Sequence, residues 1–148
     1  MYKLTLNSEC RLFALIMHGI IPVEEGRRAF LEIVAHPGFD PEIPIYVDIR
    51  AVTEVDADFP RVFMAVQAVK AEMRHFGDRS CMVILAGDGS AYGMARMLQQ
   101  VVEAVARLRM RVVASMGEAS ALLGLSAEIL ETVSGAGVES LIVGSSGE

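Results

Sequence analysis

The stretch that most constrains the fold runs over residues 80–97. An apolar run at residues 81–86 is followed by a glycine-rich break at residues 87–89, and apolar residues then recur at helical spacing. This order predicts a buried strand, a tight turn and a helix whose first turns carry Tyr92 and Arg96. Open α/β sheets usually keep their sites beyond the carboxyl ends of parallel strands. The stretch therefore predicts a central strand and the sheet edge at which a site would lie.

Length and composition indicate one globular domain with an ordinary core. The chain has 148 residues, of which 53% are hydrophobic and 22% charged, with a net charge of −6. This length is sufficient for a single well-buried core. The acidic residues are spread along the chain, whereas nucleic-acid binding requires a clustered basic face. We therefore expect no nucleic-acid partner.

The amino-terminal region carries no pattern typical of membrane insertion or export. The longest apolar run there, residues 12–17, is flanked by Arg11 and His18. A membrane helix needs roughly 20 apolar residues, and a signal peptide needs a longer apolar region and a small-residue cleavage site. We expect a cytoplasmic protein whose mature form is the whole chain, without stable membrane insertion.

The first third of the chain predicts a hairpin followed by a helix. Residues 2–6 alternate apolar and polar, and residues 12–18 are almost continuously apolar. The short connection between them predicts antiparallel neighbours. Gly19 is expected to end the second strand. A helix then begins at Pro22, which suits the first helical position, and stops at residues 36–38.

The middle of the chain predicts a strand, a charged loop and a second helix. The strand covers residues 45–49, and residues 50–58 form the loop. Asp58 is a candidate N-cap, and the helix that follows is expected to reach about residue 76. Its apolar residues repeat every three or four positions and predict one buried stripe: Val62, Val66, Val69, Met73 and Phe76.

The complete element order predicts an α/β fold. A last central strand at residues 110–116 and a short helix at residues 117–123 follow the helix that begins at Ser90. Strands alternate with helices after the first hairpin. This pattern indicates a five-stranded, mostly parallel sheet with an antiparallel N-terminal edge strand, flanked by about four helices.

The last part of the chain differs in character, so we divide the chain into a domain at residues 1–125 and an extension at residues 126–148. Residues 126–133 could form one more helix, residues 134–137 are expected to be flexible, and residues 138–143 are apolar again. The tail could dock on a partner, add an edge strand or be disordered. The sequence leaves these three alternatives open.

This order of elements resembles the SpoIIAA-like families, which are relatives of the STAS domain of anti-sigma-factor antagonists and, structurally, of the CRAL-TRIO lipid-binding fold. The resemblance covers residues 2–125. It rests on the hairpin, Val47-Asp48-Ile49-Arg50, Val55-Asp56, the strand at residues 81–86, Ala91-Tyr92-Gly93-Met94-Ala95-Arg96-Met97 and the closing Glu118-Ala119 and Leu122-Leu123-Gly124-Leu125. It implies a regulatory module, which we expect to be a homodimer, or a carrier of an apolar ligand.

One departure from the STAS pattern concerns phosphorylation. STAS antagonists carry an Asp-Ser-Ser-Gly turn with a phosphorylated serine, and the matching residues here are Asp56-Ala57-Asp58-Phe59. Alanine cannot accept phosphate, and the carboxylate of Asp58 supplies fixed negative charge near the helix start. We therefore expect a module that serine phosphorylation does not switch.

The turn at residues 87–90 could cradle a phosphate at a helix N-terminus. However, Asp88 would repel an anion, and the Lys and Ser/Thr of a P-loop are missing. Turn glycines explain the segment equally well.

Tyr92 and Arg96 lie four residues apart on one helical face. Arg96 could pair with Asp88, Asp56 or Asp58 across the strand ends. Such a pair would lock two loops, or Arg96 would bind an anion or a headgroup in a shared crevice. Both interpretations stay open.

Four aspartates could together hold a divalent cation: Asp48, Asp56, Asp58 and Asp88. Strand-end aspartates are common, so we predict no metal. No serine lies in a Gly-x-Ser-x-Gly elbow, and we predict no catalytic residue and no cofactor. The candidate binding residues are Asp48, Arg50, Asp56, Asp58, Asp88, Tyr92 and Arg96.

Nine methionines are many for this length. Thioether chains fill irregular space, so six of them could line an adaptable apolar pocket or simply form a soft core: Met64, Met73, Met94, Met97, Met110 and Met116.

We predict a non-enzymatic, STAS-like protein-interaction module. The alternative is a small protein that binds an apolar ligand or a lipid. An enzyme would require an open cleft that holds Asp48, Asp56, Asp88 and Arg96 together.

Overall fold

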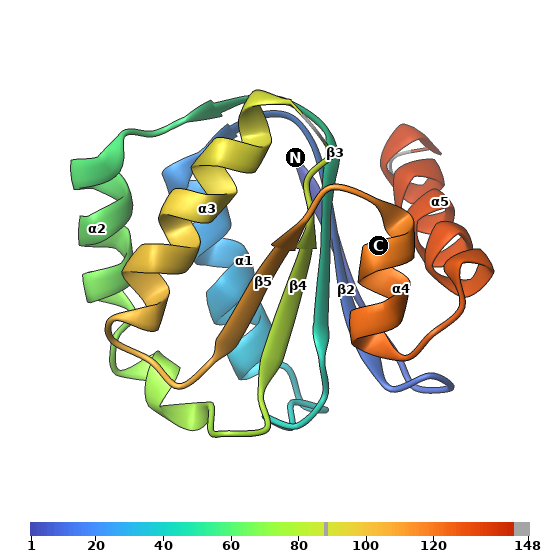
Figure 1. Cartoon of the computed structure of the whole chain (residues 1–148), viewed down its shortest axis with the longest axis horizontal. Coiled ribbons are helices and arrows are strands. Elements are labelled where there is room, and N and C mark those ends of the chain that lie inside the picture. Colours follow the sequence, from blue (N-terminus) through green and yellow to red (C-terminus); the bar gives the residue numbers. More distant parts are fainter. Residues whose placement is uncertain (88, 144–148) are drawn as a thin grey trace.

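The computed structural model describes residues 1–87 and 89–143, and of residues 136–143 it describes the backbone only. Within these ranges the chain forms five strands, five α-helices and one 3-10 helix (Figure 1). In chain order they are β1 (Tyr2–Asn7), β2 (Leu12–Pro22), α1 (Val23–Ala35), β3 (Ile45–Asp56), α2 (Phe59–Ala68), the 3-10 helix η1 (Glu72–His75), β4 (Cys81–Leu85), α3 (Ser90–Glu103), β5 (Arg109–Val113), α4 (Met116–Leu123) and α5 (Ala127–Val143).

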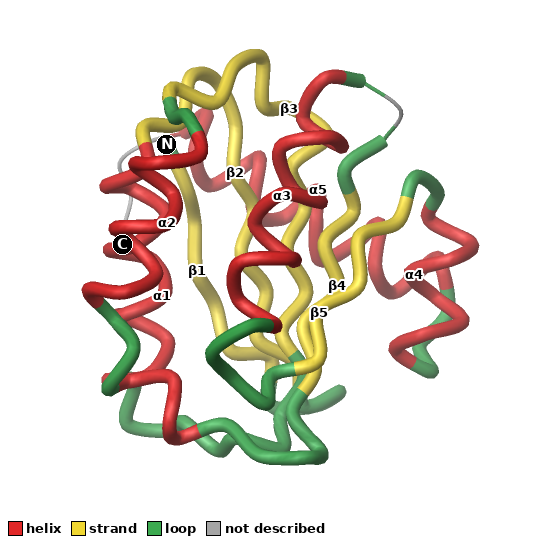
Figure 2. Tube along the Cα trace, turned by 60° about the vertical axis from the view of Figure 1, so that its left-hand side comes forward, coloured by secondary structure: helices red, strands yellow, loops and turns green. Residues whose placement is uncertain are grey.

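The strands form one sheet in the order β1-β2-β3-β4-β5, and Figure 2 shows them side by side. β1 pairs with β2 in antiparallel orientation, with Tyr2 opposite Met17, whereas the other neighbours are parallel. The predicted mixed sheet with an antiparallel N-terminal edge strand is therefore confirmed. Helical crossovers carry the chain from each parallel strand to the next, as such connections require.

The helices cover both faces of the sheet, with α1, α2 and α3 on one side and α4 and α5 on the other (Figure 1). The first face contributes Phe13, Val47 and Ile84 to the larger core. The opposite face contributes Leu12, Tyr46 and Leu85 to a smaller core, which also contains residues of α4 and α5. Successive strand residues point to opposite faces, so each buried strand supplies both cores.

β2 and β3 continue well beyond the neighbouring strands, where the sequence predicted an end at Gly19 and a loop over residues 50–58. Their pairing runs to Pro22 opposite Asp56, and the register shifts on both sides of Gly19. Gly19 has φ +78°, a conformation that favours glycine, and it lies within the strand and does not end it. Both register shifts place the extra residue on β3. Figures 1 and 2 show this two-stranded ribbon curving over toward the start of α2.

The helix after β3 is shorter than predicted. Asp58 is its N-cap, as expected, and accepts a hydrogen bond from the Arg61 backbone N–H at 3.0 Å. The α-helix ends at Ala68, and a turn at residues 69–71 leads into η1. The predicted apolar stripe is nevertheless buried along its whole length, because the tighter 3-10 turn keeps Met73 and Phe76 facing the core.

After α4 the chain forms a single helix, α5, which packs against β1 and β2. It passes through residues 134–137, which the sequence predicted to be flexible, and Ser134 is buried against the sheet. The last five residues of the predicted tail lie outside the described residues. Among the helices that the structure describes, none is long and apolar enough to cross a membrane.

The positive φ of Gly19 predicts opposite effects for two glycine-to-alanine substitutions. Gly19→Ala should lower the free energy of unfolding by about 1 kcal/mol, because a side chain disfavours a positive φ. Gly93 is exposed near the start of α3, and Gly93→Ala should raise the free energy of unfolding by up to about 1 kcal/mol. Urea denaturation measures both. Equal effects of the two substitutions would contradict the left-handed conformation of Gly19.

Candidate ligand-binding cavity

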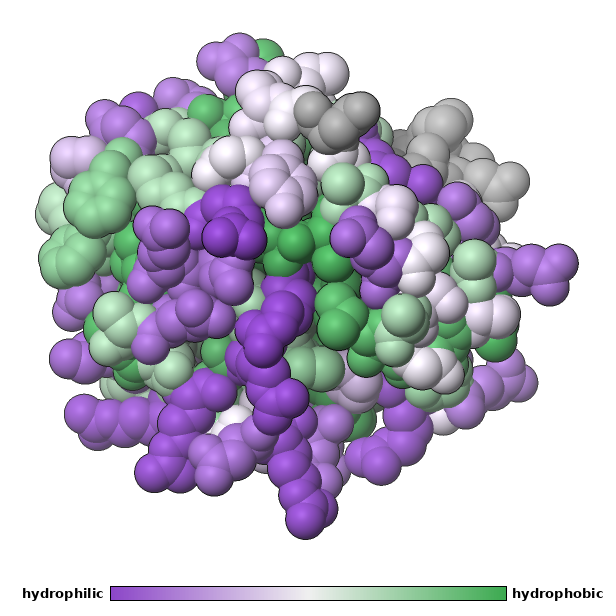
Figure 3. All heavy atoms as spheres, viewed as in Figure 1, coloured by the Kyte–Doolittle hydropathy of each residue, from purple (hydrophilic) through white to green (hydrophobic). Residues whose placement is uncertain are grey.

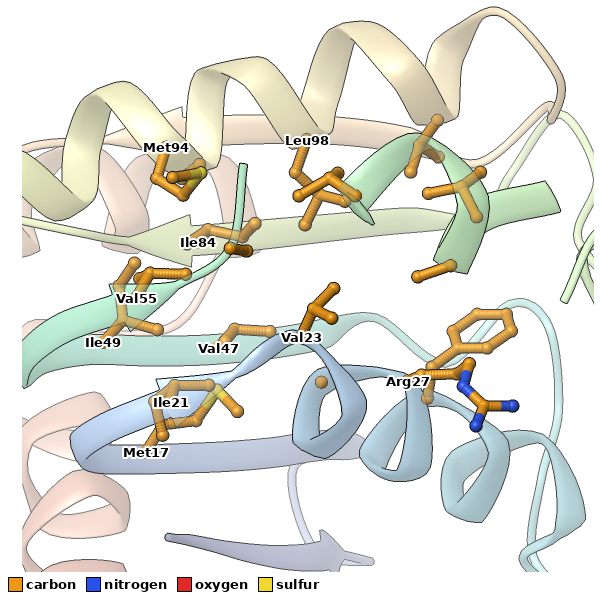
Figure 4. Close-up of a pocket in the computed structure, with 18 of the residues that line it drawn as sticks. Met17, Ile21, Val23, Arg27, Val47, Ile49, Val55, Ile84, Met94 and Leu98 are labelled. Atoms are coloured by element: carbon orange, nitrogen blue, oxygen red, sulfur yellow. The ribbon is translucent and has the colours of Figure 1, made fainter. Parts of the chain in front are cut away.

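A cavity of about 210 Å³ lies between the sheet and helices α1, α2 and α3. Its floor is formed by apolar residues of the strands, including Leu15, Val47 and Ile84, and its end by the β2–β3 ribbon. Figure 4 shows Val23 of α1 and Met94 and Leu98 of α3 around the same space. The site is therefore enclosed by every element of this layer.

The cavity exists because each helix presents small residues to the sheet. The four small residues that line it from the helices are Gly26 on α1, Ala65 on α2 and Ala91 and Ala95 on α3. A Cβ atom built on Gly26 would meet no other atom within 4 Å. Protein interiors are otherwise packed as densely as organic crystals, so these positions leave the space unfilled. The small residues are visible in the sequence, but only the packing of the three helices shows that they line the same space.

Arg27 is the only charged residue among the described residues that line the cavity. Its guanidinium group binds Glu24, with Nη2 2.6 Å and Nε 3.1 Å from Oε1. In Figure 4 this group lies at one end of the site and points away from the apolar side chains. The Arg27 side chain is 38% exposed. This end of the cavity therefore reaches solvent, while the interior offers only apolar contacts.

The methionines are divided between the cavity and other places. Met73, Met94 and Met110 line the cavity, as the pocket hypothesis expected, and Met17 and Met82 do so as well. Of the other candidates, Met97 packs against the same core, Met116 against the smaller core on the opposite face, and Met64 is exposed on α2.

The predicted strand-end residues Asp48 and Arg50 meet on the opposite face of the sheet, beneath α5. Arg50 donates from Nε to Asp48 Oδ1 at 3.0 Å and from Nη2 to Asp48 Oδ2 at 2.8 Å. It also bridges to Glu131 of α5, with Nη2 3.2 Å from Oε1. Both residues alternate with Val47 and Ile49, which face the cavity. This pair therefore fastens α5 to β3 and lies away from the cavity.

The contact between β3 and α5 consists of charged and buried polar groups. Burial alone would raise the pKa of Asp48, but the hydrogen bonds from the Arg50 side chain and backbone outweigh it, so the pKa lies below its ordinary value of 3.8. The Tyr46 hydroxyl lies 2.8 Å from Ser134 Oγ, and burial raises the pKa of Tyr46 to about 12. Tyr46, Asp48 and Arg50 thus form one polar row that contacts Glu131 and Ser134.

Asp56 and Asp58 lie elsewhere, at the start of α2. Asp56 follows Asp48 by eight residues, which is about 26 Å of extended chain. Arg61 binds both, with Nη2 3.4 Å from Asp56 Oδ1 and Nε 3.5 Å from Asp58 Oδ1. These carboxylates therefore form a local charge cluster with Arg61, where the sequence had allowed for pairing with Arg96.

The turn at residues 87–90 and the start of α3 hold the other candidates. Gly87 has φ +73°, which favours glycine and supports the turn interpretation. Tyr92 packs against the larger core, whereas Arg96 is exposed. Asp88 lies outside the described residues. The structure therefore does not gather the described members of the predicted site in one crevice.

In the part of the chain that the structure describes, the candidate aspartates lie in two separate places. This part of the chain contains no group of three or more His, Cys, Asp or Glu side chains arranged to hold an ion. Asp48 pairs with Arg50, whereas Asp56 and Asp58 pair with Arg61 at the start of α2. These three aspartates therefore do not form one group.

The geometry defines a three-layer α/β protein of the SpoIIAA-like fold class. The crystal structure of an uncharacterised protein of the DUF3478 family from Shewanella loihica PV-4, described as having a SpoIIAA-like fold, is similar, with a TM-score of 0.51. The match covers 83% of this chain and 92% of that chain at 14% sequence identity. The predicted SpoIIAA-like fold is thus confirmed. No family model and no curated protein matches the chain.

The Asp48–Arg50 pair predicts a pH-dependent contribution to stability. Because the folded-state pKa of Asp48 is depressed, its carboxylate stabilises the fold above the ordinary pKa, and this contribution is lost as the pH falls through the folded-state pKa. Asp48→Asn should lower the free energy of unfolding by about 2 kcal/mol at pH 7, less than for a fully buried pair because Arg50 is partly solvated. The difference from wild type should shrink below pH 3.8.

Asp78→Asn is the control for this measurement. Asp78 is 88% exposed and lies 4.0 Å from Arg107, so its ion pair contributes little. Its effect should be below about 0.5 kcal/mol at both pH values. A pH-independent effect of Asp48→Asn, measured by urea denaturation at pH 7 and pH 3, would contradict the assignment.

Proposed function

We propose that this chain is a non-enzymatic binding protein that takes a small apolar molecule into the cavity beneath α1, α2 and α3. The cavity itself, about 210 Å³ with an apolar lining, is the observation that carries the proposal. Apolar cavities of about 150 Å³ hold benzene and stay free of water when empty. The expected ligand is therefore somewhat larger than benzene, with roughly ten non-hydrogen atoms.

The energetic cost of an empty cavity supports a ligand. At about 24 cal/mol per Å³, a fully enclosed cavity of 210 Å³ would cost the fold about 5 kcal/mol relative to a filled one, and the opening at Arg27 makes this an upper bound. Total stabilities of domains are only about 5–15 kcal/mol. A side chain at Gly26 would reduce the void, and its Cβ atom would meet no other atom within 4 Å. A role in binding explains why the helices carry small residues here.

The apolar lining of the cavity supports one chemical class of ligand. The interior offers no polar side chain among the described lining residues, and a buried polar group without a partner costs several kcal/mol. The ligand should thus place a hydrocarbon body inside and any polar group at the solvent-facing Arg27 end. Linear alcohols fit this description.

A second candidate function is a protein-interaction module, as the STAS resemblance implies. Exposed apolar side chains on the outer surface of α2 favour it. The two functions are compatible, because the cavity and this surface lie on opposite sides of the same helix.

A series of linear alcohols from hexanol to dodecanol tests the binding proposal. Each added methylene group contributes about 0.8 kcal/mol, so the affinity measured by isothermal titration calorimetry should rise about fourfold per carbon. The increase should stop at the chain length that fills the cavity. Affinity that does not depend on chain length, or no binding by any member, would contradict the proposal.

Gly26→Leu and Gly93→Leu form a matched pair of variants for this series. Both place leucine at a helical glycine with free space around its Cβ, but only Gly26 lines the cavity. Gly26→Leu should weaken binding of the best alcohol at least tenfold and move the optimum to shorter chains, whereas Gly93→Leu should bind as wild type does. Equal affinities of the two variants would contradict the location of the site.

A further inference from the structure

Helix α2 is apolar on both its inner and its outer side. Val62 and Val66 are buried on the inner side and line the cavity. On the outer side Phe59, Phe63 and Met64, which we call the α2 outer patch, are 53%, 44% and 69% exposed. Figure 3 shows apolar side chains gathered over α2 at the left of the molecule. A helix that is apolar all round is normally covered on all sides.

The outer patch is an ordered surface with polar neighbours. The rings of Phe59 and Phe63 stack with centroids 6.1 Å apart and an interplanar angle of 27°. Besides Pro60, the helix contains only two residues that are not hydrophobic, Arg61 and Gln67. Aromatic and methionine side chains surrounded by a polar rim are typical of the centres of protein interfaces.

We propose that the α2 outer patch is covered by the same patch of a second copy of this chain. A two-fold axis places one surface against itself, so its charges must be self-complementary. The rim carries both signs: Arg61 is 51% exposed, and Asp56 and Asp58 are 57% and 60% exposed. Each guanidinium group can therefore face a carboxylate of the other copy.

The same charges disfavour an anionic partner. Two carboxylates accompany one guanidinium group at the rim. A second copy brings its own Arg61 to these carboxylates, whereas an anionic bilayer or an acidic peptide brings no cation and would meet repulsion here. The intrachain ion pairs of 3.4 and 3.5 Å are long and half-exposed, so each contributes little within one copy and leaves its charges available to a partner.

Sedimentation equilibrium of the full chain between 1 and 100 µM tests the proposal. Wild type should approach twice the 16.0 kDa of one chain at the upper concentrations. Phe63→Glu places a charge in the patch and should weaken dimerisation at least 100-fold. The control Leu122→Glu alters an equally exposed residue of α4, on the other face, and should dimerise as wild type does.

A charge exchange tests the two-fold arrangement directly. Arg61→Asp and Asp56→Arg should each weaken self-association, because each turns a contact between Arg61 of one copy and Asp56 of the other into a contact between like charges. Mixing the two variants should restore association through heterodimers. Restoration is specific to contact between copies, since no intrachain pair is rebuilt in either variant.

Three results would overturn the inference: a wild-type monomer at 100 µM, loss of the dimer in Leu122→Glu but not in Phe63→Glu, or no association in the mixture of charge variants. Binding of the monomer to phosphatidylcholine vesicles, abolished by Phe63→Glu, would assign the patch to a bilayer instead. The inference does not rest on the ligand proposal. Phe63 does not line the cavity, so the alcohol series should give the same result in Phe63→Glu.

Discussion

The parallel pairing of β2 with β3 is the constraint on which the rest of the structure depends. It extends to Pro22 and Asp56, whereas β3 and β4 pair only as far as Asp48 and Leu85. Helix α1 begins directly after the end of this ribbon, and α2 begins three residues after it. Both helices therefore start beyond the ends of the neighbouring strands and run back along the face of the sheet. The ribbon thus closes one end of the space that α1, α2 and α3 enclose.

Small residues turn this space into a cavity. If the helices carried leucine at Gly26, Ala65 or Ala95, the side chains would fill the gap between helices and sheet. The opposite face shows the contrast, because α5 is fastened there by the polar contacts of Tyr46, Asp48 and Arg50. One face is thus held by specific hydrogen bonds, and the other leaves room for a ligand.

The sequence predicted most of the architecture, because it is determined by local patterns. The order of strands and helices, the Asp58 cap and the buried stripe from Val62 to Phe76 all follow from periodicity and capping. The full length of β3 could not be predicted in this way. Its bulges and the charged residues Arg50 and Glu54 interrupt the apolar pattern, so its second half resembles a loop. An extended ribbon paired on one side only tolerates such residues, whereas a central strand would not.

The candidate site was harder to predict for a geometrical reason. Asp48 and Arg50 lie within β3, at the point where its pairing with β4 ends, and alternation along β3 directs them to the face opposite Val47 and Ile49. The position of a residue near the end of a predicted strand does not indicate which face its side chain takes. Counting alternate residues from Val47 would have placed Asp48 and Arg50 on the other face. The cavity depends on how three helices separated in sequence pack together, and no single stretch of the chain encodes it.

A crystal structure of the protein under xenon pressure tests the central claim most directly. Xenon occupies apolar cavities without requiring a hydrogen-bond partner. The account predicts a xenon atom between Val47 and Ile84 of the sheet and Gly26 of α1, and its loss in Gly26→Leu. A xenon derivative without density at this position would contradict the claim that the three helices enclose a ligand-sized cavity.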